Sequence, residues 1–126
     1  MDRTLWQKGL DARKSTLGAE YVDKSLSTAD DFNKPFQDML NEFCWGAIWG
    51  DPTLPAKTRS MINLGMLAAL GKMEEFQTHL RGAMTNGMTP NEIRAVLTQI
   101  SVYCGIPVGV DCFRIAKPII EASQKK

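Results

Sequence analysis

The chain has 126 residues, which is the length of one ordinary domain. Hydrophobic residues make up 44% of it and charged residues 23%, a composition that excludes intrinsic disorder. The formal net charge is +1, and no basic run is longer than a pair such as the terminal Lys125-Lys126, which argues against nucleic acid or an anionic membrane as the main partner. We therefore expect one domain over residues 1–126 whose main partner is neither nucleic acid nor a membrane.

The cysteines and the apolar runs indicate the compartment. The start of the chain lacks the apolar run of a signal peptide, and no stretch is long enough for a transmembrane helix. Cys44, Cys104 and Cys112 are odd in number and form no CxxC pair. We expect free thiols in a reducing cytoplasm, and we interpret each cysteine as a small buried hydrophobe rather than a reactive thiol.

Helical spacing recurs along the first half of the chain, and no strand-like alternation is found. Leu5, Trp6 and Leu10 predict a first amphipathic helix, which a turn at Gly18 ends. Residues 20–23 are expected to begin a short connecting segment, and a second, longer helix should end within 46–52. Its apolar positions, spaced at i, i+4 and i+7, are Phe32, Phe36, Met39, Leu40, Phe43 and Ala47.

Glycine and proline signals divide the second half into helices. Pro55 is a suitable first residue of a helix that runs to Gly71, and the Asn-Gly pair at 86–87 ends the next helix. Residues 89–92 (Thr-Pro-Asn-Glu) combine an N-cap, a proline at the first helical position and a capping-box glutamate. The prediction is one compact all-α bundle with short connections between antiparallel helices.

The last two helices carry apolar stripes that we expect to face the core. Pro107 can open the last helix, and Pro118 should kink or shorten it. The expected inward positions are Ile93, Val96, Leu97, Ile100 and Tyr103 in one helix, and Val110, Phe113, Ala116, Ile119 and Ile120 in the other.

His79, the only histidine, is the first candidate functional residue. Glu75 lies four residues before it, so both side chains share one face of a helix, and that face is expected to point inward. An imidazole titrates near neutrality and can serve as a general acid or base beside a carboxylate. The alternative is a partly buried histidine satisfied by its helix neighbour.

Four more side chains are candidates for binding. Arg59, near a helix start, has the planar fork that suits a carboxylate, although a surface ion pair is the commoner role. Trp45 and Trp49, at i and i+4, could wall a small cavity or form core or subunit packing. Tyr103, beside a glycine and proline turn, could place its hydroxyl in a cleft or be a capped core residue.

Several chemistries lack their signatures. The sequence contains no P-loop, no dinucleotide-binding glycine motif, no HExxH and no GxSxG. With one histidine and no cysteine cluster, a dedicated metal site is not expected.

The order of these motifs resembles the 4-carboxymuconolactone decarboxylases over nearly the whole chain. The residues that carry the resemblance are Glu20-Tyr21-Val22-Asp23, Asp31-Phe32-Asn33, Trp45-Gly46-Ala47-Ile48-Trp49, Leu54-Pro55-Ala56-Lys57-Thr58-Arg59-Ser60, Glu74-Glu75-Phe76, His79-Leu80-Arg81, Asn86-Gly87-Met88-Thr89, Glu92-Ile93 and Tyr103-Cys104-Gly105-Ile106-Pro107. The resemblance implies cofactor-free decarboxylation of 4-carboxymuconolactone to the β-ketoadipate enol-lactone in protocatechuate breakdown. It also implies an all-helical subunit of the alkylhydroperoxidase-D-like type in a homo-oligomer, a hexamer or a trimer.

The wider superfamily includes peroxidases with a CxxC dithiol followed by a histidine. Matching that histidine to His79 puts the dithiol positions on Lys72 and Glu75, and the superfamily's upstream glutamate on Ser60, so dithiol chemistry is in doubt. For the decarboxylase, we expect Arg59 to anchor a carboxylate of the lactone dianion and His79 to donate a proton or a hydrogen bond. Glu75 would fix the imidazole tautomer and raise its pKa. The alternatives are a thiol-related peroxidase or redox partner, and a non-catalytic assembly that binds small acids.

Overall fold

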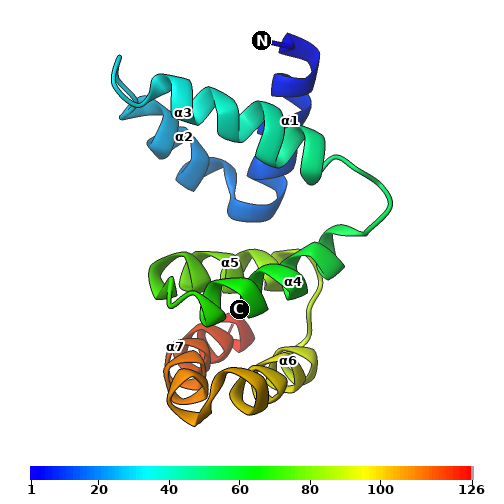
Figure 1. Cartoon of the computed structure of the whole chain (residues 1–126), viewed down its shortest axis with the longest axis vertical. Helices are drawn as coiled ribbons and strands as arrows, with labels where there is room; N and C mark the ends of the chain where they lie inside the picture. Colours follow the sequence, from blue (N-terminus) through cyan, green and yellow to red (C-terminus); the bar gives the residue numbers. More distant parts are fainter. Residues whose placement is uncertain (126) are drawn as a thin grey trace. The chain divides into compact units, whose positions relative to one another are not determined.

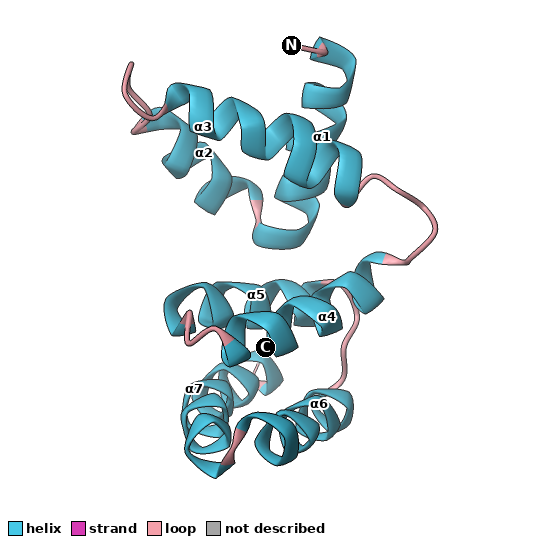
Figure 2. Cartoon of the chain, in the orientation of Figure 1, coloured by secondary structure: helices cyan, strands magenta, loops and turns pink. Residues whose placement is uncertain are grey.

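Helices account for all the regular structure over residues 1–125, the part of the chain that the computed structural model describes (Figure 2). The predicted all-α class is confirmed. The chain folds into two compact units, Met1–Ala56 and a second unit from Lys57 onward, and each is described by itself below. The single domain over 1–126 stays a prediction.

The first unit contains four helices: α1 (Arg3–Leu17), α2 (Ala19–Ser27), α3 (Lys34–Met39) and η1 (Leu40–Ile48), which is π-helical. The carboxylate of Asp2 caps α1 by accepting from the backbone N–H of Leu5 at 3.0 Å. Gly18, at φ 92°, ends α1 and starts α2. Residues 20–23 thus lie in a helix, and the predicted connecting segment is wrong, because α2 buries Val22 completely.

Two glycines allow the backbones of α1 and η1 to approach closely (Figure 1). A Cβ added to Gly9 would lie 1.6 Å from the backbone oxygen of Asn41, and one added to Gly46 would lie 2.6 Å from that of Leu5. The indole Nε1 of Trp6 also donates to Asp38 at 3.1 Å, which ties α1 to α3. The predicted long helix over 32–47 is therefore observed as α3 followed by a wider π-helical segment whose backbone packs on α1.

The apolar stripe that predicted this helix faces outward. Phe32 is 94% exposed, and Phe36, Met39 and Phe43 are each about half exposed. The buried residues of η1 are Asn41, Trp45 and Gly46, on its other side. Periodicity located the helix, but it did not indicate which side the unit would bury.

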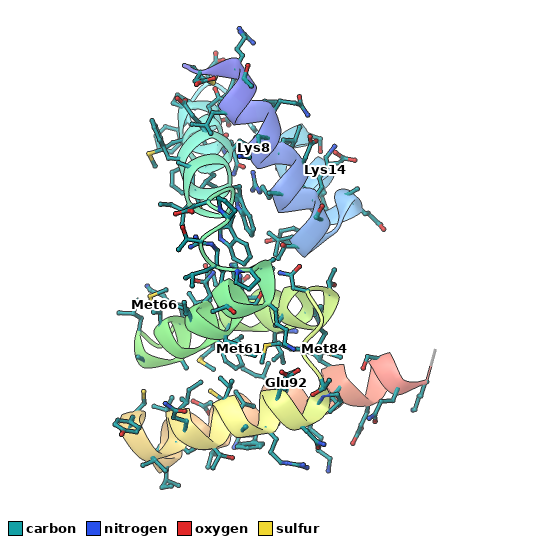
Figure 3. All side chains as sticks on the ribbon, turned by 90° about the vertical axis from the view of Figure 1, so that its right-hand side faces the viewer. Lys8, Lys14, Met61, Met66, Met84 and Glu92 are labelled. Carbon is teal, nitrogen blue, oxygen red and sulfur yellow. The ribbon has the colours of Figure 1, made fainter. Side chains whose placement is uncertain are left out.

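The second unit contains α4 (Ala56–Ala69), α5 (Met73–Thr85), α6 (Pro90–Cys104) and α7 (Ile106–Gln124), with α4 and α5 in one layer over α6 and α7 (Figure 1). Its core consists of Leu64, Ala68, Phe76, Leu80, Ala83, Met88, Ile93, Leu97, Ile100, Cys112 and Ala116. Met61 and Met84 pack against this core from the first layer, whereas Met66 lies on the outer side of α4 and is exposed (Figure 3).

Polar contacts fix the ends of α4, α5 and α6 together. The predicted capping box is confirmed: Glu92 N–H donates to Thr89 Oγ1 at 3.1 Å, and Thr89 N–H donates to Glu92 Oε1 at 3.0 Å. Glu92 also pairs with Lys57 at 2.8 Å, and Asn86 Nδ2 donates to the buried Ser60 hydroxyl at 3.0 Å. The first turn of α4 is thereby held to the end of α5 and the start of α6.

Several predicted details of this unit are wrong. Tyr103 is 84% exposed rather than inward, because α6 turns Ile100 and Cys104 toward the core on either side of it. Val110 and Phe113 are also exposed, since α7 turns Cys112 and Ala116 toward the core instead.

The predictions made from three prolines have different outcomes. Pro107 lies in the first turn of α7, as predicted. Pro118 does not shorten α7, which continues to Gln124 while Ile119 and Ile120 pack against the core. Pro55 immediately precedes α4 instead of being its first residue.

Replacing Gly9 with alanine should destabilise the first unit. The new methyl group would overlap the Asn41 carbonyl, and overpacking of this kind costs about 1–3 kcal/mol or more. The matched control is Gly65→Ala in α4, where an added Cβ meets nothing within 4 Å and a neutral or stabilising effect of up to ~1 kcal/mol is expected. Urea unfolding of both variants makes the comparison, and equal stabilities would contradict the close approach.

Candidate active site

His79 lies at the edge of the buried face of α5. Successive residues of an α-helix turn by about 100°, so Phe76, Leu80 and Ala83 share one face and His79 lies beside it. Those three side chains are buried, and His79 is half-buried. Glu75 is a further step away from the core and is exposed, so the prediction that this pair points inward holds in part for His79 and is wrong for Glu75.

Burial controls the protonation of His79. Removal from water lowers the pKa of the imidazole, and the charge of Glu75 opposes this by raising it. The prediction that Glu75 raises the pKa of this imidazole is confirmed for the direction of its own contribution. The net pKa still lies below its ordinary value, because burial outweighs Glu75. At neutral pH, His79 is therefore a neutral imidazole that can both donate and accept a hydrogen bond.

Arg59 lies in the first turns of α4, where it is half-buried. It directly precedes Ser60, whose contact with Asn86 joins this turn to the end of α5, the helix that carries His79. Lys57, two residues earlier, is held by Glu92. The backbone around Arg59 is thus fixed by contacts on both sides, which suits a residue that must present a guanidinium in one place.

The two tryptophans lie in the first unit and stack on each other: Trp45 belongs to η1, and Trp49 directly follows its last residue. Their ring centroids are 4.6 Å apart at an interplanar angle of 29°. Trp45 is 4% exposed and Trp49 is half-buried. The i, i+4 spacing therefore did bring the two indoles together, as a rigid apolar surface on one helix.

Tyr103 lines a groove of about 410 Å³ between α4 and α6. The lining residues are Met61, Ile62, Gly65, Val96, Gln99, Ile100, Tyr103 and Cys104, a set that does not include His79 or Arg59. A larger groove, of about 580 Å³, lies between α5 and α7 and contains Arg81 and Gln77. Neither of these grooves brings the predicted residues of the second unit together.

All three cysteines are free thiols, and Cys112 is buried. Burial raises the pKa of the Cys112 thiol to about 11, and it raises that of Cys44 as well. Both are protonated at neutral pH and are poor nucleophiles. Over residues 1–125, no three side chains of His, Cys, Asp or Glu gather as metal ligands, and no helix there is long and apolar enough to cross a membrane.

Sequence reasoning missed a buried polar pair in the first unit. Arg13 on α1 is 5% exposed, and its Nη1 donates at 3.0 Å to Oδ1 of Asn41, which is completely buried in η1. An arginine within an amphipathic helix is ordinarily a surface residue. The pattern of polar and apolar residues therefore did not predict that Arg13 and Asn41 would be buried together.

The family model for carboxymuconolactone decarboxylases matches residues 34–118, and the chain belongs to this family. The family resemblance drawn from the sequence is confirmed. The chain is 34% identical to 4-carboxymuconolactone decarboxylase of Acinetobacter baylyi over 95% of its own length and 90% of that protein. It is 36% identical to the nitrosuccinic acid decarboxylase npaB of Metarhizium robertsii, over 95% of its length and 84% of that protein. An uncharacterized 15.0 kDa protein of Paracoccus denitrificans is 31% identical over 65% of this chain and 62% of its own.

The imidazole of His79 should titrate below its ordinary midpoint of about 6.5. Because it is the only histidine, one pair of imidazole proton signals reports it in an NMR titration. Glu75→Gln should lower the midpoint further, since Glu75 raises the pKa, whereas Glu74→Gln, on an equally exposed neighbour, should change it less. A midpoint above about 6.5, or equal shifts in both variants, would contradict this account.

The same shift has a consequence for stability. The unfolded chain takes up the imidazole proton near pH 6.5, and the folded chain does so only at a lower pH. The contribution of neutral His79 is therefore complete above about pH 6.5 and decreases as the pH falls toward the folded pKa.

Proposed function

We propose that this protein is a cofactor-free carboxy-lyase that converts 4-carboxymuconolactone into the β-ketoadipate enol-lactone. The observation that carries the proposal is the 34% identity to a 4-carboxymuconolactone decarboxylase along 95% of the chain. Family membership and the decarboxylase names of two relatives support the reaction class. A sheltered, neutral imidazole is consistent with the proton transfer that the reaction needs.

The substrate supplies its own electron sink. It is an unsaturated five-membered lactone that carries a carboxylate and a carboxymethyl group. When the C–C bond to the carboxylate breaks, CO2 leaves, and the electron pair moves through the ring double bond onto the lactone carbonyl oxygen. Protonation of the carbon next to that carbonyl then gives the enol-lactone. The protein has to bind a dianion, stabilise the oxyanion and deliver one proton.

Residue types suggest how these tasks are divided. Arg59 binds a carboxylate through its guanidinium fork, since its backbone is fixed by the contacts of Ser60 and Lys57. His79 enters the reaction as a neutral imidazole that donates a hydrogen bond to the developing oxyanion, or relays the proton after the bound substrate has raised its pKa. Glu75 acts on this imidazole through its charge.

The aromatic residues are assigned to substrate binding. The stacked pair Trp45 and Trp49 offers a rigid apolar wall that excludes water, which favours the conversion of a carboxylate into neutral CO2. Tyr103 offers a phenol at the groove between α4 and α6.

Nitrosuccinate is the second candidate substrate, because the chain is 36% identical to a nitrosuccinic acid decarboxylase over 95% of its length. Chemically it is also a dianion with an internal electron sink: loss of the carboxylate on the nitro-bearing carbon leaves a nitronate, which is then protonated. The same side-chain roles would serve both reactions, so product analysis with each acid distinguishes the substrates.

A thiol peroxidase is the less supported alternative. The superfamily dithiol positions correspond to Lys72 and Glu75, and the raised pKa of Cys44 and Cys112 keeps these thiols protonated. A variant without cysteines should retain decarboxylation, and its rate of thiol-dependent peroxide reduction should equal that of the wild type. A non-catalytic assembly that binds small acids would bind the lactone without releasing CO2.

A homo-oligomer, a hexamer or a trimer, is part of the proposal. Its support is the apolar surface of α3, η1 and the turn before them, formed by Phe32, Phe36, Met39 and Phe43, which is exposed in the single chain. The three free thiols fit the reducing cytoplasm as the compartment.

His79→Gln should lower kcat for CO2 release from freshly generated carboxylactone by about 10²–10⁴-fold, because a positioned proton donor is lost. Arg59→Gln should instead raise KM by ~10-fold or more, because a charge-assisted contact to the substrate is lost. Arg114→Gln, on an exposed arginine that pairs with Asp111, is the control and should retain wild-type kinetics. Circular dichroism checks the fold, and near-normal turnover of His79→Gln would remove His79 from the mechanism.

The double substitution of Phe36 and Phe43 by serine should reduce the assembly size measured by light scattering, because it removes two exposed apolar side chains from one helical face. Lys24→Ser, at an exposed position of α2, should leave the size unchanged. A wild-type chain that is monomeric at micromolar concentration would contradict the proposed oligomer.

A further inference from the structure

Arg13 is a buried cation without a carboxylate partner among residues 1–125. Its described hydrogen bond goes to a neutral amide, that of Asn41, at 3.0 Å. The ionisable groups that act on it are the phenol of Tyr21 and the thiol of Cys44. Lys14, the next residue, does have a counter-ion, Asp23, at 3.2 Å. The chain thus pairs the more accessible cation, Lys14, and leaves the buried guanidinium next to it without a counter-charge.

The unsatisfied atoms of this pair are all donors. Asn41 turns its oxygen toward the guanidinium, because the opposite orientation would bring two donors together. Nε of Arg13 and Nδ2 of Asn41 are buried with no hydrogen-bond partner. Only a group that accepts hydrogen bonds can satisfy both.

A negative charge fits this arrangement better than water. Leaving a guanidinium buried without a counter-charge is strongly unfavourable, and a water molecule does not neutralise it. A carboxylate has two acceptor oxygens, and arginine binds it through paired N–H groups such as Nε and a terminal nitrogen. Burial lowers the pKa of Arg13, and the nearby Tyr21 and Cys44 raise it; a bound anion would act in the same direction as those two groups.

The surrounding backbone holds the pair in place. Asn41 belongs to the π-helical segment η1, whose carbonyl at this residue packs against Gly9, one turn before Arg13. Short π-helical segments are frequent at functional sites. The close α1–η1 contact therefore fixes both donors relative to each other.

We propose that Arg13 and Asn41 form a binding site for the carboxylate group of a small organic acid. The site lies in the first unit and is distinct from the carboxylate anchor assigned to Arg59 above. Under the proposed function, one source of this group is the substrate dianion; the other is a free cellular carboxylate. The inference itself rests on the buried donors and not on the reaction.

The test is a titration of the full-length protein, labelled with ¹⁵N-arginine, with succinate, using sodium chloride at equal ionic strength as the reference. The Nε–H signal of Arg13 should shift and saturate at millimolar succinate or below. Lys14→Gln should retain this binding, because Lys14 already has Asp23 as its partner. The absence of a saturable shift in the wild type would overturn the proposal.

The decisive variant is Asn41→Asp, which places a carboxylate of the same size beside the guanidinium. If the site binds anions, this internal charge should weaken succinate binding by ~10-fold or more. If Arg13 and Asn41 only join α1 to η1, thermal stability will change while the succinate response stays the same, and that result would also overturn the proposal. Arg13→Lys, which keeps the charge but loses the fork, should weaken binding too, and it serves as the second variant if Asn41→Asp does not fold; because this variant lacks the Arg13 signal, its succinate affinity is measured by calorimetry beside that of the wild type.

The two sources are separated by kinetics. If the substrate occupies the site, Asn41→Asp should raise KM for the carboxylactone by ~10-fold with a smaller change in kcat. If a free carboxylate occupies it, succinate binding is lost while KM is unchanged. Because the NMR readout requires no turnover, failure of the decarboxylase assay would leave this test intact.

Discussion

The packing of Phe76 and Leu80 into the core of the second unit determines the chemistry available to α5. Both side chains are fully buried, so the rotation of the helix about its axis is fixed. At about 100° per residue, His79 must then lie at the boundary of the core and Glu75 outside it. An apolar contact made by neighbouring residues thus decides how much water reaches the one imidazole, and with it the protonation state in which that imidazole meets a substrate.

Two opposing influences act on His79, and burial is the larger. A carboxylate one turn away would dominate if both groups were equally sheltered, but Glu75 is exposed, and water screens its charge. Under the proposed function, a neutral imidazole suits the binding of a dianion, because the bound negative charge itself can raise the pKa and bring in the proton. The enzyme would then acquire its proton donor on binding.

The first unit depends on close backbone contact rather than on large apolar side chains. Gly9 and Gly46 let α1 and η1 touch, and the buried side of η1 includes an asparagine, a tryptophan and a glycine. Buried polar groups are costly unless they are satisfied. The Arg13–Asn41 pair still has two unsatisfied donors, so it lowers the stability of the folded chain. Destabilising groups of this kind are common at binding sites.

The sequence by itself determined the helices and many of their ends, because these depend on local chemistry: Thr89 and Glu92 specify the start of α6, and glycines specify the ends of α1 and α5. It also determined the family and singled out His79, the only imidazole. Only the tertiary structure decided which face each helix buries. The phenylalanines of α3 and η1 and Tyr103 are exposed, Glu75 is outside the core, and Arg13 is inside it. Periodicity specifies that side chains share a face, whereas burial depends on which neighbouring helix covers that face, and a single helix carries no record of its neighbours.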